Sequence, residues 1–292
     1  MKVKAISPWF GGKRTMAPLI VTELGKHSQY FEPFCGSMAV LLAKAPCQKE
    51  TVNDLHGDLI NLAHCLQDID LAERLYDRLQ RCLMSEGLVD RAKHELATSD
   101  LSPADRAYWY FLSSWMRRNG TAGTKRIDYQ IAVRWTKGGG SPTVRFRNAV
   151  ESIPWWHERL RNVVILQRDA FSIMNRFEDV KQAALYVDPP YFAASRSGYR
   201  QGPGRSNKYL HELDHKSTLW GNDHVRLRDA LAQYKKARVV VSYYDCPGIR
   251  DLYADWTIIE HTRLKHISSQ CGRGVMAKEA PEILILNGPS YA

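Results

Sequence analysis

The sequence predicts an α/β protein in which a largely parallel β-sheet is covered on both faces by helices. Short apolar runs, each of the length of a buried strand, alternate with segments of helical character along most of the chain. Several of these runs end at a glycine or an acidic residue. The 292 residues, 44% of them hydrophobic, suffice for one sizeable core or for a core with a small subdomain.

The predicted strands are residues 30–35, 50–53, 163–167, 184–187, 239–243, 257–260 and 283–286. The strand ends that meet a small or acidic residue are Cys35-Gly36, Asn53-Asp54, Arg168-Asp169 and Val187-Asp188. In open α/β sheets, ligands bind at the carboxyl ends of the strands. We therefore expect the functional site to form where these strand ends meet.

A helical stretch replaces this alternation between residues 59 and 150. Within it, Ser102-Pro103-Ala104-Asp105 predicts a helix start, because a hydroxyl can cap the first turn and proline fits there. The aromatic-rich helix that begins here runs into Arg117-Arg118-Asn119-Gly120.

A run of basic residues follows this helix. Eight of them, set against Asp128 as the one acid, give a local excess of +7; they are Arg117, Arg118, Lys125, Arg126, Arg134, Lys137, Arg145 and Arg147. A solvated face is the common interpretation of such a run. Interruption by Gly120, Gly123 and residues 138–140 favours instead a loop or hairpin arm that enters a DNA groove.

The composition limits the partners. Lysine and arginine outnumber aspartate and glutamate 41 to 31, and the formal charge of +10 suits a polyanion such as nucleic acid. The six cysteines form no CxxC pair and no cluster with zinc spacing, which indicates free thiols and no metal site. No apolar stretch matches a signal peptide or a membrane span. We therefore expect a soluble cytoplasmic protein that binds no membrane.

Asp188-Pro189-Pro190-Tyr191 directly follows an apolar strand and is the strongest signal in the sequence. A proline-stiffened turn with a capping aspartate is the alternative. The N6 amine of adenine is a poor nucleophile, because its lone pair is delocalised, until its N–H groups meet well-placed acceptors. The Asp188 carboxylate and the Pro189 carbonyl are such acceptors, and the prolines hold them rigidly. Tyr191 offers a stacking face to a base taken out of the duplex.

With Phe31-Glu32-Pro33-Phe34-Cys35-Gly36-Ser37 upstream, this tetrapeptide resembles the Dam-type (D12 class, alpha group) DNA adenine-N6 methyltransferases. Ser7-Pro8-Trp9-Phe10-Gly11-Gly12-Lys13 is similar to the W-x-G-G-K element of that family, which packs over the methyl donor. The order of motifs is similar as well, and the resemblance extends to the strand at residues 282–287. Met38 departs from the family, which often has a small residue at this place. The resemblance implies a Rossmann-like sheet, S-adenosylmethionine as methyl donor and double-stranded DNA as substrate.

The chemistry of single residues agrees with a donor site. Gly36 lets the backbone turn closely beneath a ligand, and Asp54 stands where nucleoside-binding folds place an acid on ribose hydroxyls. The resemblance assigns Asp169 to the adenine amino group of the donor, and a helix cap is the alternative for both aspartates. Trp9 or Phe10 can cover the sulfonium or the adenine ring. The predicted donor-binding residues are Trp9, Phe10, Gly11, Lys13, Glu32, Pro33, Phe34, Gly36, Ser37, Asp54, Asp169, Ala170, Phe171 and Asp188.

The sequence thus predicts a catalytic domain formed by residues 1–58 and 151–292, with a mainly helical target-recognition subdomain, residues 59–150, inserted into it. The predicted DNA contacts are Arg117, Arg118, Asn119, Lys125, Arg126, Arg134, Lys137 and Arg196. The resemblance places the enzyme in a bacterial or phage-infected cell and suggests GATC as its target, whereas the residues alone leave the target open.

Three other functions compete with this interpretation. An RNA adenine-N6 methyltransferase uses the same tetrapeptide, although the basic insert favours duplex DNA. Cytosine-N4 methyltransferases more often carry serine where this chain has Asp188. An inactive relic that only binds DNA has no need of Gly36, Asp54, Asp188 and Tyr191 together.

Overall fold

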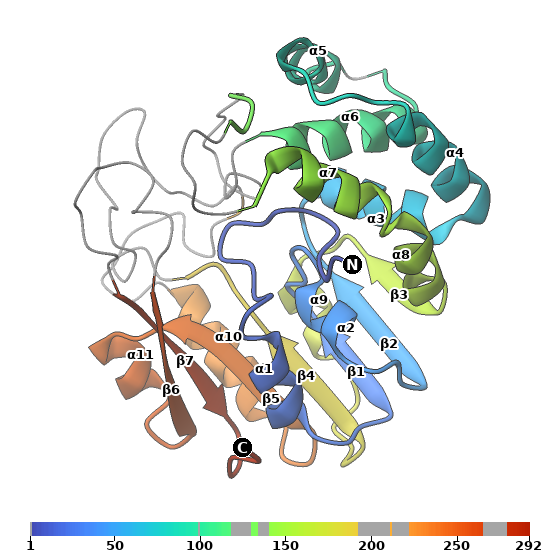
Figure 1. Ribbon diagram of the computed structural model, residues 1–292. Helices are drawn as coiled ribbons and strands as arrows, with labels where there is room; N and C mark the ends of the chain where they lie inside the picture. Colours follow the sequence, from blue (N-terminus) through green and yellow to red (C-terminus); the bar gives the residue numbers. More distant parts are fainter. Residues whose placement is uncertain are drawn as a thin grey trace.

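The computed structural model describes residues 2–98, 100–117, 130–133, 140–191, 211, 222–264 and 279–292. Its strands are β1 (Gln29–Glu32), β2 (Lys49–Asn53), β3 (Val163–Leu166), β4 (Ala183–Val187), β5 (Arg238–Tyr244), β6 (Thr257–Leu264) and β7 (Glu279–Leu286). They form one sheet in the order β3-β2-β1-β4-β5-β7-β6 (Figure 1). Neighbours from β3 to β5 are parallel, and β7 runs antiparallel to β5 and β6. This is the Rossmann-like α/β sheet that the sequence predicts.

The first strand is shorter than predicted. It ends at Glu32 rather than at Cys35, because Pro33 has no N–H group for the ladder and the chain turns there. After the turn, the Cys35 N–H donates to the Asn53 carbonyl at 2.9 Å. The turn therefore keeps the segment after β1 beside the end of β2.

Helices cover both faces of the sheet. Along β4, Ala184 and Tyr186 enter one core while Leu185 and Val187 enter the other, because successive side chains of a strand alternate. The first core includes residues of α1 (Ala17–Leu24) and α2 (Ala39–Ala43). The second includes residues of α9 (Ala170–Met174), α10 (Asn222–Ala232) and α11 (Pro247–Leu252). Burial on both faces explains why these strands appear in the sequence as continuous apolar runs.

The other helices gather on one side of the molecule (Figure 1). They are α3 (Gly57–Gln67), α4 (Ile69–Gln80), α5 (Glu86–Leu96), α6 (Pro103–Met116), α7 (Pro142–Val150) and α8 (Ile153–Leu160). Helix α6 begins as predicted, with the Ser102 hydroxyl accepting from the Asp105 N–H at 3.1 Å. The Trp115 indole N–H donates to the Ile6 carbonyl at 3.2 Å, and that of Trp156 to Val3 at 2.7 Å. These helices therefore share the first core with the N-terminal segment, and the proposed insert begins inside α3.

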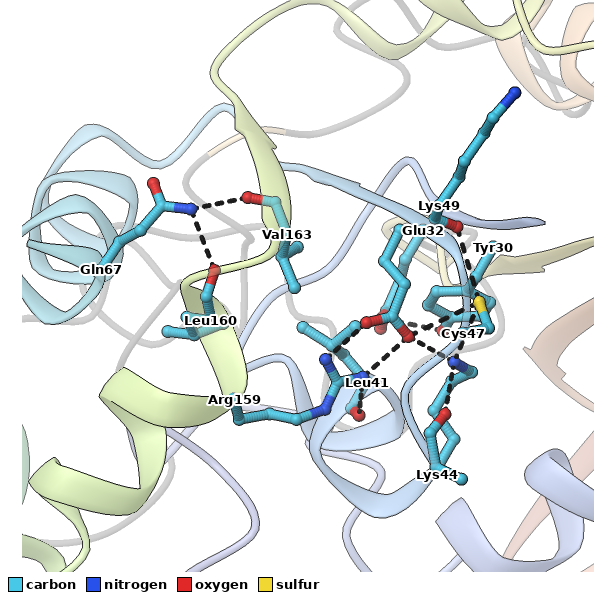
Figure 2. A network of polar contacts seen from close by, with 12 residues as sticks. Tyr30, Glu32, Leu41, Lys44, Cys47, Lys49, Gln67, Arg159, Leu160 and Val163 are labelled. Carbon is cyan, nitrogen blue, oxygen red and sulfur yellow. Dashed lines mark hydrogen bonds and ion pairs between the residues drawn. The ribbon is translucent and has the colours of Figure 1, made fainter. Parts of the chain in front are cut away.

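A buried ion cluster joins β2 to α8. The Glu50 carboxylate accepts from the Arg159 guanidinium and from the Lys44 ammonium, and all three side chains are at most 7% exposed. Figure 2 shows Arg159, Leu41 and Lys44 in this network. Arg159 also donates to the Leu41 carbonyl at 3.1 Å. Burial acts to raise the pKa of Glu50, but the bonds from Arg159 and Lys44 outweigh it and hold the pKa below its ordinary value. The cluster fixes β2, and with it the Asn53-Asp54 end, against the helices.

The two ends of the first part of the basic insert lie side by side. Arg117 and Ile131 form an antiparallel bridge, and the Ala132 N–H donates to the Met116 carbonyl at 2.8 Å. The later part differs from the predicted loop, because residues from Pro142 onward form α7. Its Arg145 donates to the carbonyls of Trp115 and Arg117 at 2.8 and 2.9 Å, so this arginine anchors the end of α6.

Candidate functional site

A cavity of about 320 Å³ opens at the carboxyl ends of the parallel strands. Each strand end that the sequence singled out contributes to its wall, namely Cys35-Gly36, Asn53-Asp54, Arg168-Asp169 and, from the fourth pair, Asp188. They meet because parallel strands all end at the same edge of a sheet. The predicted donor-binding residues all line this one cavity, and they are Trp9, Phe10, Gly11, Lys13, Glu32, Pro33, Phe34, Gly36, Ser37, Asp54, Asp169, Ala170, Phe171 and Asp188.

The floor of the cavity requires a glycine at position 36. Gly36 has a φ of 43°, and a Cβ atom there would stand 2.8 Å from Nε1 of Trp9. Two residues later, Met38 adopts φ 60° and ψ 32°, the left-handed conformation that favours glycine. Met38 is fully buried. Met38 is the residue at which this chain departs from the family that it resembles. The backbone conformation at Met38 favours glycine.

Asp54 ties two strand ends together. One of its carboxylate oxygens accepts from the Gly36 N–H and the other from the His56 N–H, each at 2.9 Å. The following helix α3 is capped not by Asp54 but by His56, whose Nδ1 accepts from the Leu59 N–H at 3.2 Å. Burial lowers the pKa of His56, so the imidazole is neutral and its proton resides on Nε2. His56 also lines the cavity, and sequence reasoning missed it.

Asp169 is both a helix cap and part of the cavity wall. Its Oδ1 accepts from the Ser172 N–H at 3.1 Å at the start of α9. The Arg226 guanidinium lies over the ring of the neighbouring Phe171, 4.1 Å from its centroid. Arg226 comes from α10 and lines the same cavity. No local signal marks it, because α10 is distant in sequence from the strand ends.

The tetrapeptide Asp188-Pro189-Pro190-Tyr191 is joined to the N-terminal segment by an ion pair. Nζ of Lys13 lies 3.0 Å from Oδ1 of Asp188 and donates to the Gly11 carbonyl at 2.9 Å. Burial acts to lower the pKa of Lys13, but the charges of Asp188 and Glu282 outweigh it and the pKa is raised. Lys13 is therefore an ammonium that binds both the Gly11 carbonyl and the Asp188 carboxylate.

The same oxygen of Asp188 has a second donor. The Ser242 hydroxyl donates to Oδ1 at 2.8 Å, and the Tyr186 hydroxyl lies 2.9 Å from the Ser242 oxygen. Neither Ser242 nor Tyr186 was predicted from the sequence. Ser242 sits within the apolar strand β5 and gives no pattern of its own.

The other members of the tetrapeptide are placed differently. Pro189 and Pro190 line the cavity. Tyr191 is 2% exposed, and its ring packs edge-on against Tyr244 at 4.5 Å and beneath the Lys13 ammonium at 4.8 Å. The ring predicted to stack on a base is therefore covered in this structure.

Glu32 is a protonated acid at neutral pH. Burial, reinforced by the nearby charge of Asp188, raises its pKa to about 8, even though the Tyr30 hydroxyl donates to its carboxyl at 2.9 Å. The side chain lines the cavity. The cavity wall therefore contains a neutral carboxyl at Glu32.

Of the predicted DNA contacts, the structure describes Arg117, which is half-buried and whose Nε donates to the Ser113 carbonyl. The others lie outside the described residues, and they are Arg118, Asn119, Lys125, Arg126, Arg134, Lys137 and Arg196.

The described cysteines are free thiols, and Cys271 lies outside the described part. Within the described residues there is no group of His, Cys, Asp and Glu side chains that could hold a metal ion, and no helix there is long and apolar enough to span a bilayer.

Comparison with known proteins identifies relatives of this chain. Residues 9–267 match the family described as D12 class N6 adenine-specific DNA methyltransferase. The retron Ec67 DNA adenine methylase of Escherichia coli is 26% identical over 98% of this chain and 92% of its own length. A precorrin-8w decarboxylase from Methanobacterium thermoautotrophicum aligns over 94% of this chain and 89% of its own, with a TM-score of 0.37 and 11% identity. From the extent of the family match, the chain belongs to the D12 class of N6 adenine-specific DNA methyltransferases, and it is an enzyme of DNA adenine methylation.

Proposed function

We propose that this enzyme transfers a methyl group from S-adenosylmethionine to N6 of an adenine that has been flipped out of double-stranded DNA. The observation that carries the proposal is the position of Asp188. Its carboxylate lines the same cavity as all the predicted donor-binding residues and is held there by Lys13 and Ser242. Methyl donor and target amine can therefore meet at one place.

The cavity wall fits S-adenosylmethionine. Asp54 offers a carboxylate, already oriented by two backbone N–H groups, to ribose hydroxyls, and the absence of a Cβ atom at Gly36 lets the Trp9 ring pack against the backbone there. Aromatic rings of Trp9, Phe10 and Phe171 suit the adenine ring and the cationic sulfonium. When bound, the donor supplies an electrophilic methyl group.

The tetrapeptide orients the target amine for methyl transfer. The Asp188 carboxylate and the Pro189 carbonyl accept the two N–H groups of N6, which directs the nitrogen lone pair at the methyl group. Asp188 need not act as a strong base, because the methylated amine can release its proton to water after transfer. The Lys13 ammonium, 3.0 Å from Oδ1, helps to hold the Asp188 carboxylate in place as an acceptor.

Stacking of the target adenine on Tyr191 requires a rearrangement. The ring is buried against Tyr244 and Lys13, so it must become exposed before a flipped base can lie on it. An aromatic platform of this kind is common where enzymes take a base out of a duplex.

The formal charge of +10 and the basic insert support binding of the DNA backbone. The antiparallel bridge between Arg117 and Ile131 brings together the two described residues on either side of the predicted arm, which itself lies outside the described residues. Contacts of this arm with a DNA groove are part of the proposal.

The decisive experiment measures transfer of labelled methyl from S-adenosylmethionine to unmethylated genomic DNA, to total RNA and to no nucleic acid. Nucleoside analysis of the product and single-molecule mapping follow. N6-methyladenine at one short DNA motif is expected. Label in RNA alone would support an RNA methyltransferase, and donor binding without any product would support the inactive relic.

A further inference from the structure

We propose that Ser242 is a positioning residue for methyl transfer, whose hydroxyl, supported by Tyr186, fixes one oxygen of the Asp188 carboxylate so that the other oxygen is available to the amine being methylated. The inference rests on the proposed function and extends it to two residues with no motif of their own. Ser242 acts through Asp188 and is not itself assigned a contact with substrate.

The sheet register brings Ser242 to Asp188. Strands β4 and β5 are parallel neighbours in which Tyr186 pairs with Val240 and Val187 with Val241, so the next position along places Asp188 beside Ser242. The Ser242 side chain is fully buried, and its oxygen lies 2.8 Å from Oδ1 of Asp188. The contact is thus a product of strand pairing inside the core.

The direction of the hydrogen bonds follows from the number of protons. A serine hydroxyl has one proton, and an ionised carboxylate can only accept, so the Ser242 proton is directed at Asp188. The remaining lone pairs of Ser242 accept from the Tyr186 hydroxyl at 2.9 Å. Burial, with the Asp188 charge nearby, raises the pKa of Tyr186 well above its ordinary value, so the phenol keeps the proton that it donates. The chain therefore runs from Tyr186 through Ser242 to Asp188.

Both partners of Asp188 bind the same oxygen. Lys13 approaches Oδ1 from the N-terminal segment and Ser242 approaches it from β5, while no described residue donates to Oδ2. A single bond from Lys13 would hold Oδ1 only through the end of a long side chain. A second donor, Ser242 on strand β5, fixes the plane of the carboxylate. An acceptor of the target N–H needs this rigidity.

The test compares the variants Ser242→Ala, Tyr186→Phe and the double variant with the unmodified enzyme. Single-turnover methyl transfer is measured with saturating S-adenosylmethionine and DNA, and donor affinity is measured separately by calorimetry. Loss of the Ser242 bond is expected to slow transfer about tenfold with donor affinity nearly unchanged, since a hydrogen bond to a charged group is lost. The Tyr186→Phe variant should be slowed about threefold. The double variant should be no slower than Ser242→Ala, because Tyr186 acts through Ser242.

Ser152→Ala is the matched control. Ser152 is likewise a buried serine, which donates to the Asn148 carbonyl and accepts from the Val3 N–H, but it makes no hydrogen bond to Asp188. This variant should lose stability and keep the transfer rate. If Ser242→Ala does not fold, Ser242→Cys replaces it, because a thiol of similar size is a weaker donor. A crystal structure of the Ser242 variant should show the Asp188 carboxylate rotated.

The outcomes separate this inference from the proposed function. A Ser242 variant that transfers methyl at the unmodified rate, with its carboxylate unmoved, overturns the positioning role while leaving the proposed function intact. An additional loss in the double variant would show that Tyr186 acts directly on a ligand and would overturn the relay. An unmodified enzyme that methylates no DNA would overturn the proposed function and this inference with it.

Discussion

Nζ of Lys13 lies 3.0 Å from Oδ1 of Asp188, and the two side chains are only 4% and 21% exposed. This pair joins the N-terminal segment, which lines the cavity, to the tetrapeptide that follows β4. A charge removed from water in this way requires its partner, since an unpaired buried ammonium is strongly destabilising. The N-terminal segment and the tetrapeptide are therefore coupled through one ion pair.

Asp188→Asn should abolish methylation while leaving donor binding largely intact. The amide keeps one oxygen for Lys13 and Ser242 but then presents an N–H group where the target amine needs an acceptor. We expect methyl transfer to fall by at least about 100-fold and donor affinity, measured by calorimetry, to change little. Stability should fall as well, because Lys13 loses an anionic partner. Retained activity in a folded variant would contradict the role of the carboxylate.

Gly36→Ala should weaken donor binding. The added methyl group meets Nε1 of Trp9 at 2.8 Å, and φ at this position is 43°, so both the ring and the backbone are strained. A loss of about 2 kcal/mol in the free energy of unfolding is expected, with donor affinity reduced about tenfold through displacement of Trp9. Gly87→Ala on helix α5 is the control, since a Cβ there meets nothing within 4 Å. That control should be neutral or stabilising by up to about 1 kcal/mol.

Glu32→Gln should change how stability depends on pH. The pKa of Glu32 is raised to about 8 in the folded protein, whereas an exposed glutamate titrates near about 4.3. Between these values the folded state keeps a proton that the unfolded state has lost. Stability of the unmodified protein therefore falls as pH rises through this window, by at most about 1.4 kcal/mol per pH unit, and the dependence ends above pH 8.

The neutral amide side chain in the Glu32→Gln variant removes that dependence, so the variant should gain stability relative to the unmodified protein as pH rises from about 5 to about 8. Urea unfolding across this range measures the difference. Glu158→Gln changes an exposed carboxyl paired with Arg161 and should give a curve parallel to that of the unmodified protein. A Glu32→Gln curve that is also parallel would show that Glu32 is ionised at neutral pH.

Arg117→Gln should weaken DNA binding. Arg117 is the first residue of the basic run, forms an antiparallel β-bridge with Ile131 and is half-buried. If its guanidinium contacts a phosphate, the slope of log affinity against log salt concentration should become shallower by about 1. Fluorescence anisotropy at several salt concentrations measures both effects. Arg161→Gln, an exposed arginine at the end of α8, is the control, and equal affinities for the two variants would locate the DNA contact elsewhere.

The sequence by itself determined the fold class, the approximate positions of the strands and most of the residues around the cavity, although not His56, Tyr186 or Arg226. Strands buried on both faces must be apolar throughout, so β4 and β5 are visible in the sequence as runs such as residues 183–187. Parallel strands share one carboxyl edge, so motifs placed after different strands necessarily converge. That rule is why residues as distant as Gly36, Asp54, Asp169 and Asp188 can be assigned to one site from the order of motifs along the chain.

Only the tertiary structure decided how the members of this site hold one another. The pairing of Ser242 with Asp188 depends on the register between β4 and β5, and the burial of Tyr191 depends on packing against Tyr244. A polar residue within an apolar strand carries no local sign of its partner. Hydrogen bonds and ion pairs act over about 3 Å, whereas sequence patterns record burial and turns, so the contacts that orient Asp188 become known only when the strands are placed side by side.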